Sequence, residues 1–422
     1  MNRFNSYILL TMAFLLSSMA TFAQPPTHNA NEKALKVAVR SIGQLATEIS
    51  VEVANAVKEI DFEALSRDAE KTAVLSEVEA QKIVCEIERI DFTPIIQQSQ
   101  AIAEEAAKID WGHIWEEVDA NHIGFQREKV IEKSYPVNIN NKLNIDNRYG
   151  KIVVRNWNRN EIKVTVRIRT AEDSERKAQE ALDRVRIDES KSGNNISFKT
   201  NISQGDSNWW SSLTGSGSNR ALNVDYEVYM PKGNELALVN RYGSIEMDDR
   251  DGKVSVSISY GSLQAGRLSA QSNSLAIAYS KAEVEYLNEG EVSVRYGGFT
   301  LSEAEKLSLS LSYTSGSEIG KVNREANISL RYSGGFKMGL GSAIRKANVA
   351  ASYSSVNINP ASNAAFNLNV AVNYGGFEYD HNLAHIDSKS ENNTSKSYEG
   401  YWNKTSGNSL NISSRYGSVK LK

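Results

Sequence analysis

Two histidines are the side chains whose spacing comes nearest to a metal site. His381 and His385 are four residues apart, the spacing that places two imidazoles on one face of a helix. Their neighbours are mostly Asn and Ser, which favour a loop over a helix, and no third ligand has a fixed position beside them. The sequence therefore predicts a solvated loop at this place, with no metal ion and no cofactor.

Three tryptophans lie in polar segments and are candidate ligand contacts. Trp209 and Trp210 are adjacent in a Ser-, Gly- and Asn-rich segment, residues 203–221, and Trp402 lies in a second polar segment, residues 380–408. Adjacent indoles in a polar loop are costly to expose unless they contact a sugar ring, a lipid or another subunit. Packing of these indoles back onto the protein itself is the simpler interpretation.

No set of residues matches a catalytic signature. Enzymes that cleave acidic polysaccharides need clustered carboxylates, or Arg and Lys side chains, that project together into a cleft. Here the polar positions of the C-terminal part are mostly Ser, Asn, Arg and Lys with isolated Glu, and no Ser–His–Asp signature, phosphate loop or HExxH occurs. We predict no catalytic residues. The acidic turn at residues 248–252 has too few ligands for a calcium loop and is predicted to join two strands.

A phrase centred on tyrosine determines which elements position these side chains. It recurs between residues 148 and 417, six times as Tyr-Gly, and the intervals from Tyr242 to Tyr374 are 17 to 21 residues. A period near 20 is typical of stacked repeats. The repeated tyrosines, which we interpret as structural, are Tyr242, Tyr260, Tyr279, Tyr296, Tyr313, Tyr332, Tyr353, Tyr374 and Tyr416.

Each copy of the phrase follows a strict alternation of apolar and polar residues. Val254, Val256 and Ile258 share their parity with Tyr260, which indicates a strand with one buried face. The tyrosine is expected to point inward or to close a corner, and the following glycine to supply the freedom of a turn. One unit cannot bury its apolar face alone, so we expect parallel coils stacked about 4.8 Å apart. An antiparallel sandwich is the alternative.

Residues 1–23 have the features of a secretory signal peptide. Arg3 precedes an apolar run from Tyr7 to Leu16, and small residues lead to Ala23. The run is too short to span a bilayer as a mature helix, and no later apolar segment approaches 18 residues. We expect an exported protein, periplasmic, outer-membrane-associated or extracellular, with no transmembrane segment in the mature chain.

Residues 31–60 carry a heptad pattern. Apolar residues recur in alternating steps of four and three at positions 35, 39, 42, 46, 49, 53, 56 and 60. We predict helices near 31–60, 63–90 and 94–108. The polar side of this stripe has no belt of Lys and Arg, so packing as a hairpin, bundle or coiled-coil dimer is favoured over binding to a membrane surface. Cys85 is the only cysteine, which excludes an internal disulfide.

Charge is unevenly distributed along the chain. The net charge is −3, but residues 31–120 carry −10 and Arg3 carries +1, so residues 121–422 carry +6. Neither half is charged densely enough to indicate nucleic-acid binding. We expect a protein or polysaccharide of the cell envelope as partner, and self-association through residues 31–60.

We therefore predict an α + β chain of four parts. Residues 1–23 form the signal peptide and residues 24–125 a helical segment. Residues 126–235 form a β-rich cap with a short helix, predicted within 171–188, and the start of the solenoid. Residues 236–422 form the solenoid, a single-stranded parallel β-helix.

The strand–Arg-Tyr-Gly–strand phrases, following a signal peptide, resemble the "putative adhesin" family of β-strand-repeat domains in Gram-negative envelope proteins. The resemblance covers about residues 137–422. It implies a right-handed parallel β-helix with a non-catalytic binding, adhesion or scaffolding role, and it carries over no functional residues. Two other functions stay open. The first is a polysaccharide-active β-helix enzyme, and the second is an envelope sensor or regulator that acts through the helical segment.

The heptad pattern leads to a prediction about association. Ile49 lies on the apolar stripe, so Ile49→Asp should abolish concentration-dependent association of the mature protein while leaving the β region folded. Sedimentation at several concentrations measures this. Equal association of the wild type and the variant would show that the stripe is covered within one chain.

Overall fold

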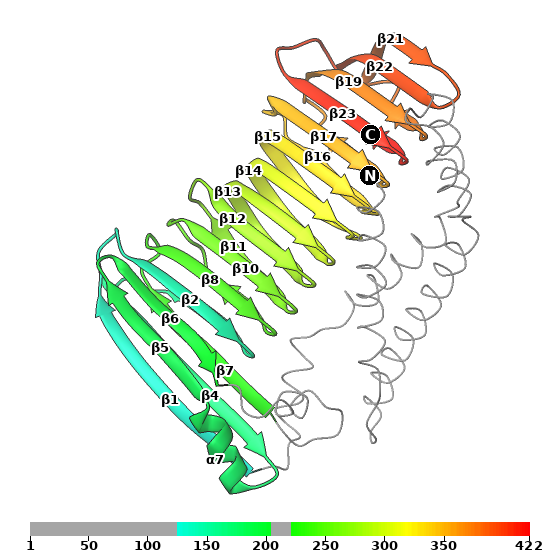
Figure 1. Ribbon diagram of the computed structural model, residues 1–422. Coiled ribbons are helices and arrows are strands. Elements are labelled where there is room, and N and C mark those ends of the chain that lie inside the picture. The colour runs from blue at the N-terminus through cyan, green and yellow to red at the C-terminus, as the bar shows by residue number, and fades with distance from the viewer. Residues whose placement is uncertain (1–124, 204–220) are drawn as a thin grey trace, which may run out of the picture. The chain divides into compact units, whose positions relative to one another are not determined.

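The computed structural model of the protein describes residues 125–203 and 221–422 (Figure 1). These residues form 24 strands and one helix, α7 (Glu175–Asp183). Within them, no helix has the length and apolar character needed to cross a membrane. The predicted signal peptide, the predicted helical segment, and Trp209 and Trp210 lie outside the described residues.

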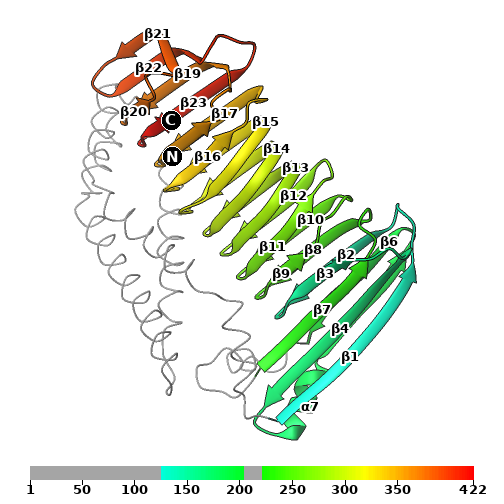
Figure 2. The same ribbon diagram turned by 180° about the vertical axis from the view of Figure 1, so that it is seen from behind.

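The described chain winds into coils, and most coils give one strand to each of two parallel faces, which we call face A and face B (Figures 1 and 2). Face A consists, in spatial order, of β6 (Asn195–Ile202), β2 (Lys142–Arg148), β8 (Glu235–Arg241), β10 (Val254–Ser259), β12 (Asn273–Ala278), the second halves of β13 (Lys281–Arg295), β14 (Gly298–Ser312) and β15 (Glu318–Arg331), then β17 (Lys346–Ser352), β23 (Ser409–Arg415) and β19 (Phe366–Asn373). The parallel pairing along this order is the stacking that the repeat predicts, and the antiparallel sandwich is wrong.

Face B uses the shorter strands and the first halves of the long ones. In spatial order it consists of β7 (Ala221–Met230), β3 (Ile152–Asn156), β9 (Ile245–Met247), β11 (Ser262–Leu268), the first halves of β13, β14 and β15, then β16 (Phe336–Leu340), β18 (Val356–Pro360), β24 (Val419–Leu421) and β20 (Phe377–Tyr379). Its neighbours also pair in parallel, so each coil crosses from face A to face B at the same corner.

Antiparallel strands cover both ends of the parallel stack. β4 (Glu161–Glu172) and β1 (Phe125–Pro136) extend face B beyond β7, and β5 (Val185–Ser192) extends face A beyond β6. At the other end, β22 (Ser395–Trp402) and β21 (Ala384–Glu391) extend face A beyond β19. The outermost strands β5 and β21 expose charged and polar side chains, which disfavours edge-to-edge association.

Two local predictions have different outcomes. The short helix predicted within 171–188 is confirmed as α7, whose first turn is capped by the Ser174 hydroxyl. The solvated loop predicted within 380–408 is wrong, because most of that segment is the β21–β22 hairpin. Tyr398 and Trp402 on β22 face the core. Their alternation was not recognised in the sequence because the other residues of β22 are mostly Ser, Lys, Glu and Gly.

The last coil lies out of sequence order. β23 lies between β17 and β19, and β24 lies between β18 and β20. The chain therefore forms the β19–β20 coil and the capping hairpin first along its sequence, and its final residues fill the gap between the two preceding coils. An interval of about 20 residues carries no information about such an insertion.

One parity of each strand forms a continuous apolar core between the faces. In β14, Leu307, Leu309 and Leu311 are each 1–2% exposed, whereas Ser308 and Ser310 between them face solvent. Each such leucine stabilises the fold by about 1.5–3 kcal/mol relative to an exposed one. The core therefore fixes which residues face outward at every coil.

Ten tyrosines form one continuous stack along the corner where face A turns into face B. Neighbouring ring centroids are 4.7–5.2 Å apart and the rings are 5–12° from parallel. In spatial order the stack is Tyr149, Tyr242, Tyr260, Tyr279, Tyr296, Tyr313, Tyr332, Tyr353, Tyr416 and Tyr374. Closing a corner was one of the two arrangements that the alternation allowed.

The tyrosine, and not the following glycine, supplies the turn. All ten tyrosines have a left-handed backbone with φ between 49° and 61°, which is rare for a residue with a side chain. This conformation interrupts the alternation and moves the ring from the core to the surface, where Tyr260 is 45% exposed. Gly261 is needed for a different reason, because a Cβ there would lie 1.9 Å from the carbonyl oxygen of Gly243 in the neighbouring coil.

Serine or threonine replaces that glycine at four coils and adds buried hydrogen bonds. The Ser354 hydroxyl donates to the carbonyl of Ser352 at 2.9 Å and accepts from the backbone N–H of Ser333 in the next coil at 2.9 Å. The corner is thus held by ring stacking outside and by hydroxyl bonds inside.

The stack predicts a graded effect on stability. Tyr313 contacts two rings and Tyr374 only one, so Tyr313→Ala should lower the free energy of unfolding by about 2 kcal/mol and Tyr374→Ala by about 1 kcal/mol. Both alanines keep the left-handed backbone, so its strain cancels in the comparison. Urea denaturation measures the difference, and equal losses would contradict a contribution from stacking.

Candidate binding groove

A shallow groove of about 520 Å³ crosses the outer surface of face A. It runs over six neighbouring strands, which are β13, β14, β15, β17, β23 and β19 in spatial order (Figure 1). Because these strands pair in register, outward residues at equivalent positions form rows that follow the stacking direction. Two such rows line the groove, and a third row and the tyrosine stack lie beside it on the same face.

The first row, which we call the asparagine row, consists of Asn327, Asn348, Asn411 and Asn369 on four neighbouring strands. The Asn348 amide donates to the Asn327 carbonyl oxygen at 2.8 Å, and the Asn411 amide donates to Asn348 at 3.0 Å. An amide offers two donors and two acceptor lone pairs, so each side chain keeps groups for a ligand. The side chain of Asn369 has no hydrogen bond to another described residue.

The second row is made of small residues and forms the floor. Ser310, Ser329, Ala350, Ser413 and Ala371 line the groove two residues beyond the asparagine row on each strand. Their short side chains leave the sheet surface low between longer neighbours. The serine hydroxyls add donors and acceptors to this floor.

The third row, the arginine row, consists of Arg295, Arg331 and Arg415. Ser312 and Ser352 alternate with them in register. All three arginines are exposed, and none forms an ion pair with another residue of the described ranges. By contrast, Arg155, Arg167 and Arg324 elsewhere on the described surface each pair with a carboxylate. Glu291, at the end of the groove, is the one carboxylate among its lining residues.

The tyrosine stack borders the arginine row. Burial raises the pKa of Tyr313, Tyr332 and Tyr353 above the usual value of 10.0. Their hydroxyls therefore stay protonated near neutral pH and can both donate and accept hydrogen bonds. The groove and the rows beside it combine amides, hydroxyls, aromatic rings and guanidinium groups that have no ion pair among the described residues, which suits a polar, hydroxyl-rich ligand.

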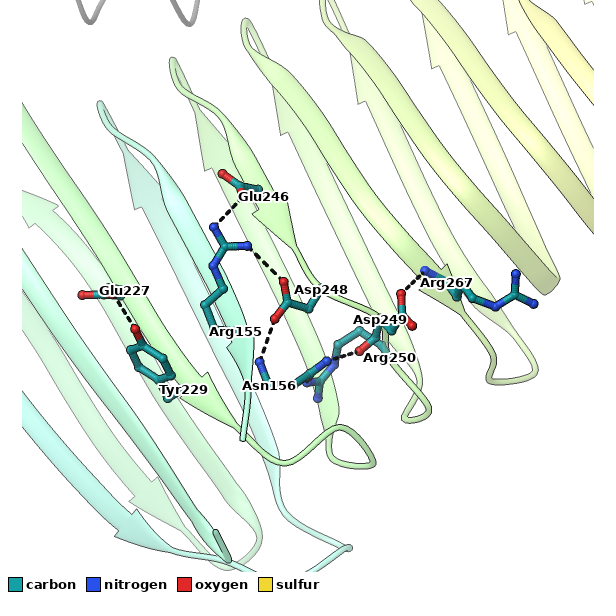
Figure 3. Close-up of polar contacts among 9 residues, drawn as sticks. All are labelled: Arg155, Asn156, Glu227, Tyr229, Glu246, Asp248, Asp249, Arg250 and Arg267. Carbon is teal, nitrogen blue, oxygen red and sulfur yellow. Dashed lines mark hydrogen bonds and ion pairs between the residues drawn. The ribbon is translucent and has the colours of Figure 1, made fainter. Parts of the chain in front are cut away.

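A second hollow, on face B, is occupied by its own ion pairs (Figure 3). Arg155 pairs with Glu246 and, at 3.0 Å, with Asp248. The second carboxylate oxygen of Asp248 accepts from the backbone N–H of Asn156 at 3.0 Å, and Asp249 accepts from that of Arg267 at 2.9 Å. These groups satisfy one another and join β3 to β9 and β11, which indicates a structural role.

Arg250 anchors the acidic turn of residues 248–252 between β9 and β10, and it is fully buried. Its guanidinium donates to the Asn156 side chain at 2.8 Å (Figure 3). It also donates to the carbonyls of Pro231 and Asn234, each at 2.9 Å. Burial lowers the pKa of Arg250 to about 10, so it remains a cation near neutral pH.

The candidates named from the sequence do not gather at the groove. Trp402 is fully buried and stacks on Phe366, so the ligand contact expected there is wrong: alternate residues of β22 face the core. His381 follows β20 and packs edge-on against Tyr379, whereas His385 lies on β21, so no helix joins the two histidines. In the part of the chain that the structure describes, no three His, Cys, Asp or Glu side chains are grouped to hold a metal ion.

The groove residues follow a pattern in the sequence that catalytic and metal-binding motifs do not include. When the repeats are aligned on their tyrosines, the position five residues earlier is asparagine before Tyr332, Tyr353, Tyr374 and Tyr416. Over the same coils, taken in spatial order, the position just before the tyrosine is Arg331, Ser352, Arg415 and Asn373, so arginine alternates with an uncharged residue. Recognising this required the outward parity of the strands and the true order of the coils.

Comparisons with known proteins do not assign the chain to a family. No protein-family model and no curated protein matches it. Similar solved structures include a "putative adhesin" of Parabacteroides distasonis, at 10% identity and TM-score 0.32, which covers 70% of this chain and 97% of its own. A "putative lipid binding protein" of the same species gives 11% identity and TM-score 0.29, with 70% of this chain and 97% of its own covered. A "putative cell adhesion protein" of Clostridium sporogenes gives 10% identity and TM-score 0.19, and the match covers 70% of this chain and 99% of that protein.

The buried arginine predicts a contrast between two substitutions. Arg250→Leu leaves three acceptors without their donor, one of them the buried Asn234 carbonyl, and should lower the free energy of unfolding by about 3 kcal/mol. Arg155→Leu removes only half-exposed ion pairs and should cost less than about 1 kcal/mol. Urea denaturation of both variants tests this, and similar losses would refute the structural role assigned to Arg250.

Proposed function

We propose that the protein is a non-catalytic binding module of the cell envelope that holds an extended polysaccharide chain lengthwise in the groove of face A. The observation that carries this proposal is the asparagine row, in which four amides lie in register beside a floor of small residues. We also retain the export expected from residues 1–23, which would bring the groove into contact with envelope glycans.

The repetition of the groove favours a repeating ligand. Neighbouring coils present polar groups at equivalent positions at intervals of about 4.8 Å, so a polymer with a regular repeat can meet recurring partners along the groove. Single hydrogen bonds contribute only about 0.5–1.5 kcal/mol each, but several along one chain add up. The self-association expected from residues 31–60 would place several grooves together and raise the overall avidity.

The carboxylates of the described surface favour binding over hydrolysis. Glycoside hydrolysis uses two carboxyl groups about 5–9.5 Å apart on either side of the scissile bond. Glu291 is the one carboxylate lining the groove, and it lies at its end. The face B hollow is lined by five carboxylates, and each lies within 4.0 Å of a Lys or Arg nitrogen. Glu246 and Asp248 pair with Arg155, Asp249 with Lys232, Glu283 with Lys281 and Glu285 with Arg267. Neither arrangement offers two free carboxylates facing a sugar chain.

The proposed function predicts that Asn348, at the centre of the asparagine row, contributes to the affinity for oligosaccharides. Asn348→Leu keeps the side-chain size and the strand but removes the central amide of the row, so affinity for soluble oligosaccharides should fall about tenfold through the loss of two hydrogen bonds. Asn357→Leu, on face B, is the matched control and should leave affinity unchanged. Titration calorimetry with cellohexaose and a hyaluronan octasaccharide as probes measures both.

Two outcomes would refute the proposed function. If neither probe binds the mature wild-type protein, or if both substitutions weaken binding equally, the face A groove is not the binding site. If the protein releases new reducing ends from either probe, the non-catalytic assignment is wrong.

A further inference from the structure

We propose that the ligand of the face A groove is an anionic polysaccharide with a carboxylate on every second sugar, recognised by Arg295, Arg331 and Arg415. This inference rests on the proposed function, because it names the class of glycan that the same groove takes. It follows from the spacing, the unpaired charge and the register of the arginine row.

The spacing comes directly from the strand register. Arg295 pairs with Ser312, Ser312 with Arg331, Arg331 with Ser352, and Ser352 with Arg415. Arginines therefore occur on alternate strands, two strand intervals or about 9.6 Å apart. The neighbouring tyrosine rings have a similar spacing per strand, with centroids 5.0 Å apart for Tyr296 and Tyr313 and 5.1 Å apart for Tyr313 and Tyr332.

This distance matches the disaccharide repeat of an extended β-linked glycan lying along the stacking direction. One coil then faces one sugar, and an arginine faces every second sugar. Neighbouring sugars of an extended β-1,4-linked chain are turned over relative to one another, so a glycan charged on every sugar would also place carboxylates on the edge that faces the asparagine row and Glu291. A neutral glycan would leave the guanidinium groups without a partner.

The charge of the row supports the same ligand. The three guanidinium groups are exposed and have no carboxylate partner among the described residues, so they are available to an anion. A guanidinium can bind a carboxylate through two parallel hydrogen bonds, which fixes the carboxylate's position as well as its charge.

The three rows also fix how such a chain would lie. The arginine row takes the carboxylates, the small residues accommodate the sugar rings, and the asparagine row binds hydroxyl or amide groups on the other side. Glu291 lies in register with the asparagine row through Ser308, so its negative charge opposes carboxylates on that side of the groove. The ligand is therefore oriented with its acidic edge toward the tyrosine stack.

The test uses three oligosaccharides and the mature full-length protein. The probes are a hyaluronan octasaccharide, with a carboxylate on alternate sugars; a β-1,4-linked polymannuronate octamer, with one on every sugar; and cellohexaose, with none. The inference predicts that hyaluronan binds at least about fivefold more tightly than either of the others. Binding of hyaluronan should weaken as salt is raised, and binding of cellohexaose should not.

Two variants distinguish binding by the arginine row from a general effect of positive charge on the surface. Arg331→Gln should weaken hyaluronan binding about fivefold and leave cellohexaose binding unchanged. Arg241→Gln is the matched control, because Arg241 occupies the same place before a stacked tyrosine but lies three strands beyond Arg295, outside the groove. It should have no effect. Urea denaturation midpoints confirm that both variants are folded.

The failures of the two proposals are distinguishable. If polymannuronate binds as tightly as hyaluronan, or if Arg241→Gln and Arg331→Gln weaken binding equally, the spacing rule is overturned. Loss of affinity in Asn348→Leu would then still support a groove that binds glycans. If none of the three probes binds the wild type, the proposed function fails and this inference fails with it.

Discussion

In-register parallel pairing between coils is the constraint on which the rest of this structure depends. Main-chain hydrogen bonds between neighbouring strands place equivalent residues about 4.8 Å apart, and the apolar core allows only one parity to face inward. A residue type that recurs at one position of the repeat therefore forms a row across neighbouring strands. The tyrosine stack, the asparagine row and the arginine row are three consequences of this geometry, and each would disappear if the register slipped by one residue.

The corner shows how two opposing terms are balanced. A left-handed backbone at a non-glycine residue costs roughly 1–3 kcal/mol, and ten tyrosines adopt it. Each stacked ring pair contributes about 0.5–1.5 kcal/mol, and the hydrogen bonds of neighbouring backbones further fix the turn. The same conformation carries the ring outward, so the residue that ends each strand of face A also forms an aromatic edge beside the groove. Structure and candidate function are therefore linked at one residue per coil.

Much of the architecture could be predicted because repetition and alternation are properties of the sequence itself. The shared parity of Val254, Val256 and Ile258 indicated a buried face, and the interval near 20 residues indicated parallel coils. The insertion of β23 between β17 and β19 could not be predicted, because strand order depends on which free edge each segment meets. Trp402 was misjudged because its polar neighbours hide the inward parity of β22. The arginine and asparagine rows become visible only when the coils are placed in spatial order.

The most direct test of the account is a crystal structure of the protein with the hyaluronan octasaccharide bound. The account predicts that the sugar chain follows the stacking direction over β14, β15, β17 and β23, with successive carboxylates beside Arg331 and Arg415 and the opposite edge on Asn348 and Asn411. A chain that crosses the coils at right angles, or that lies on face B, would contradict it.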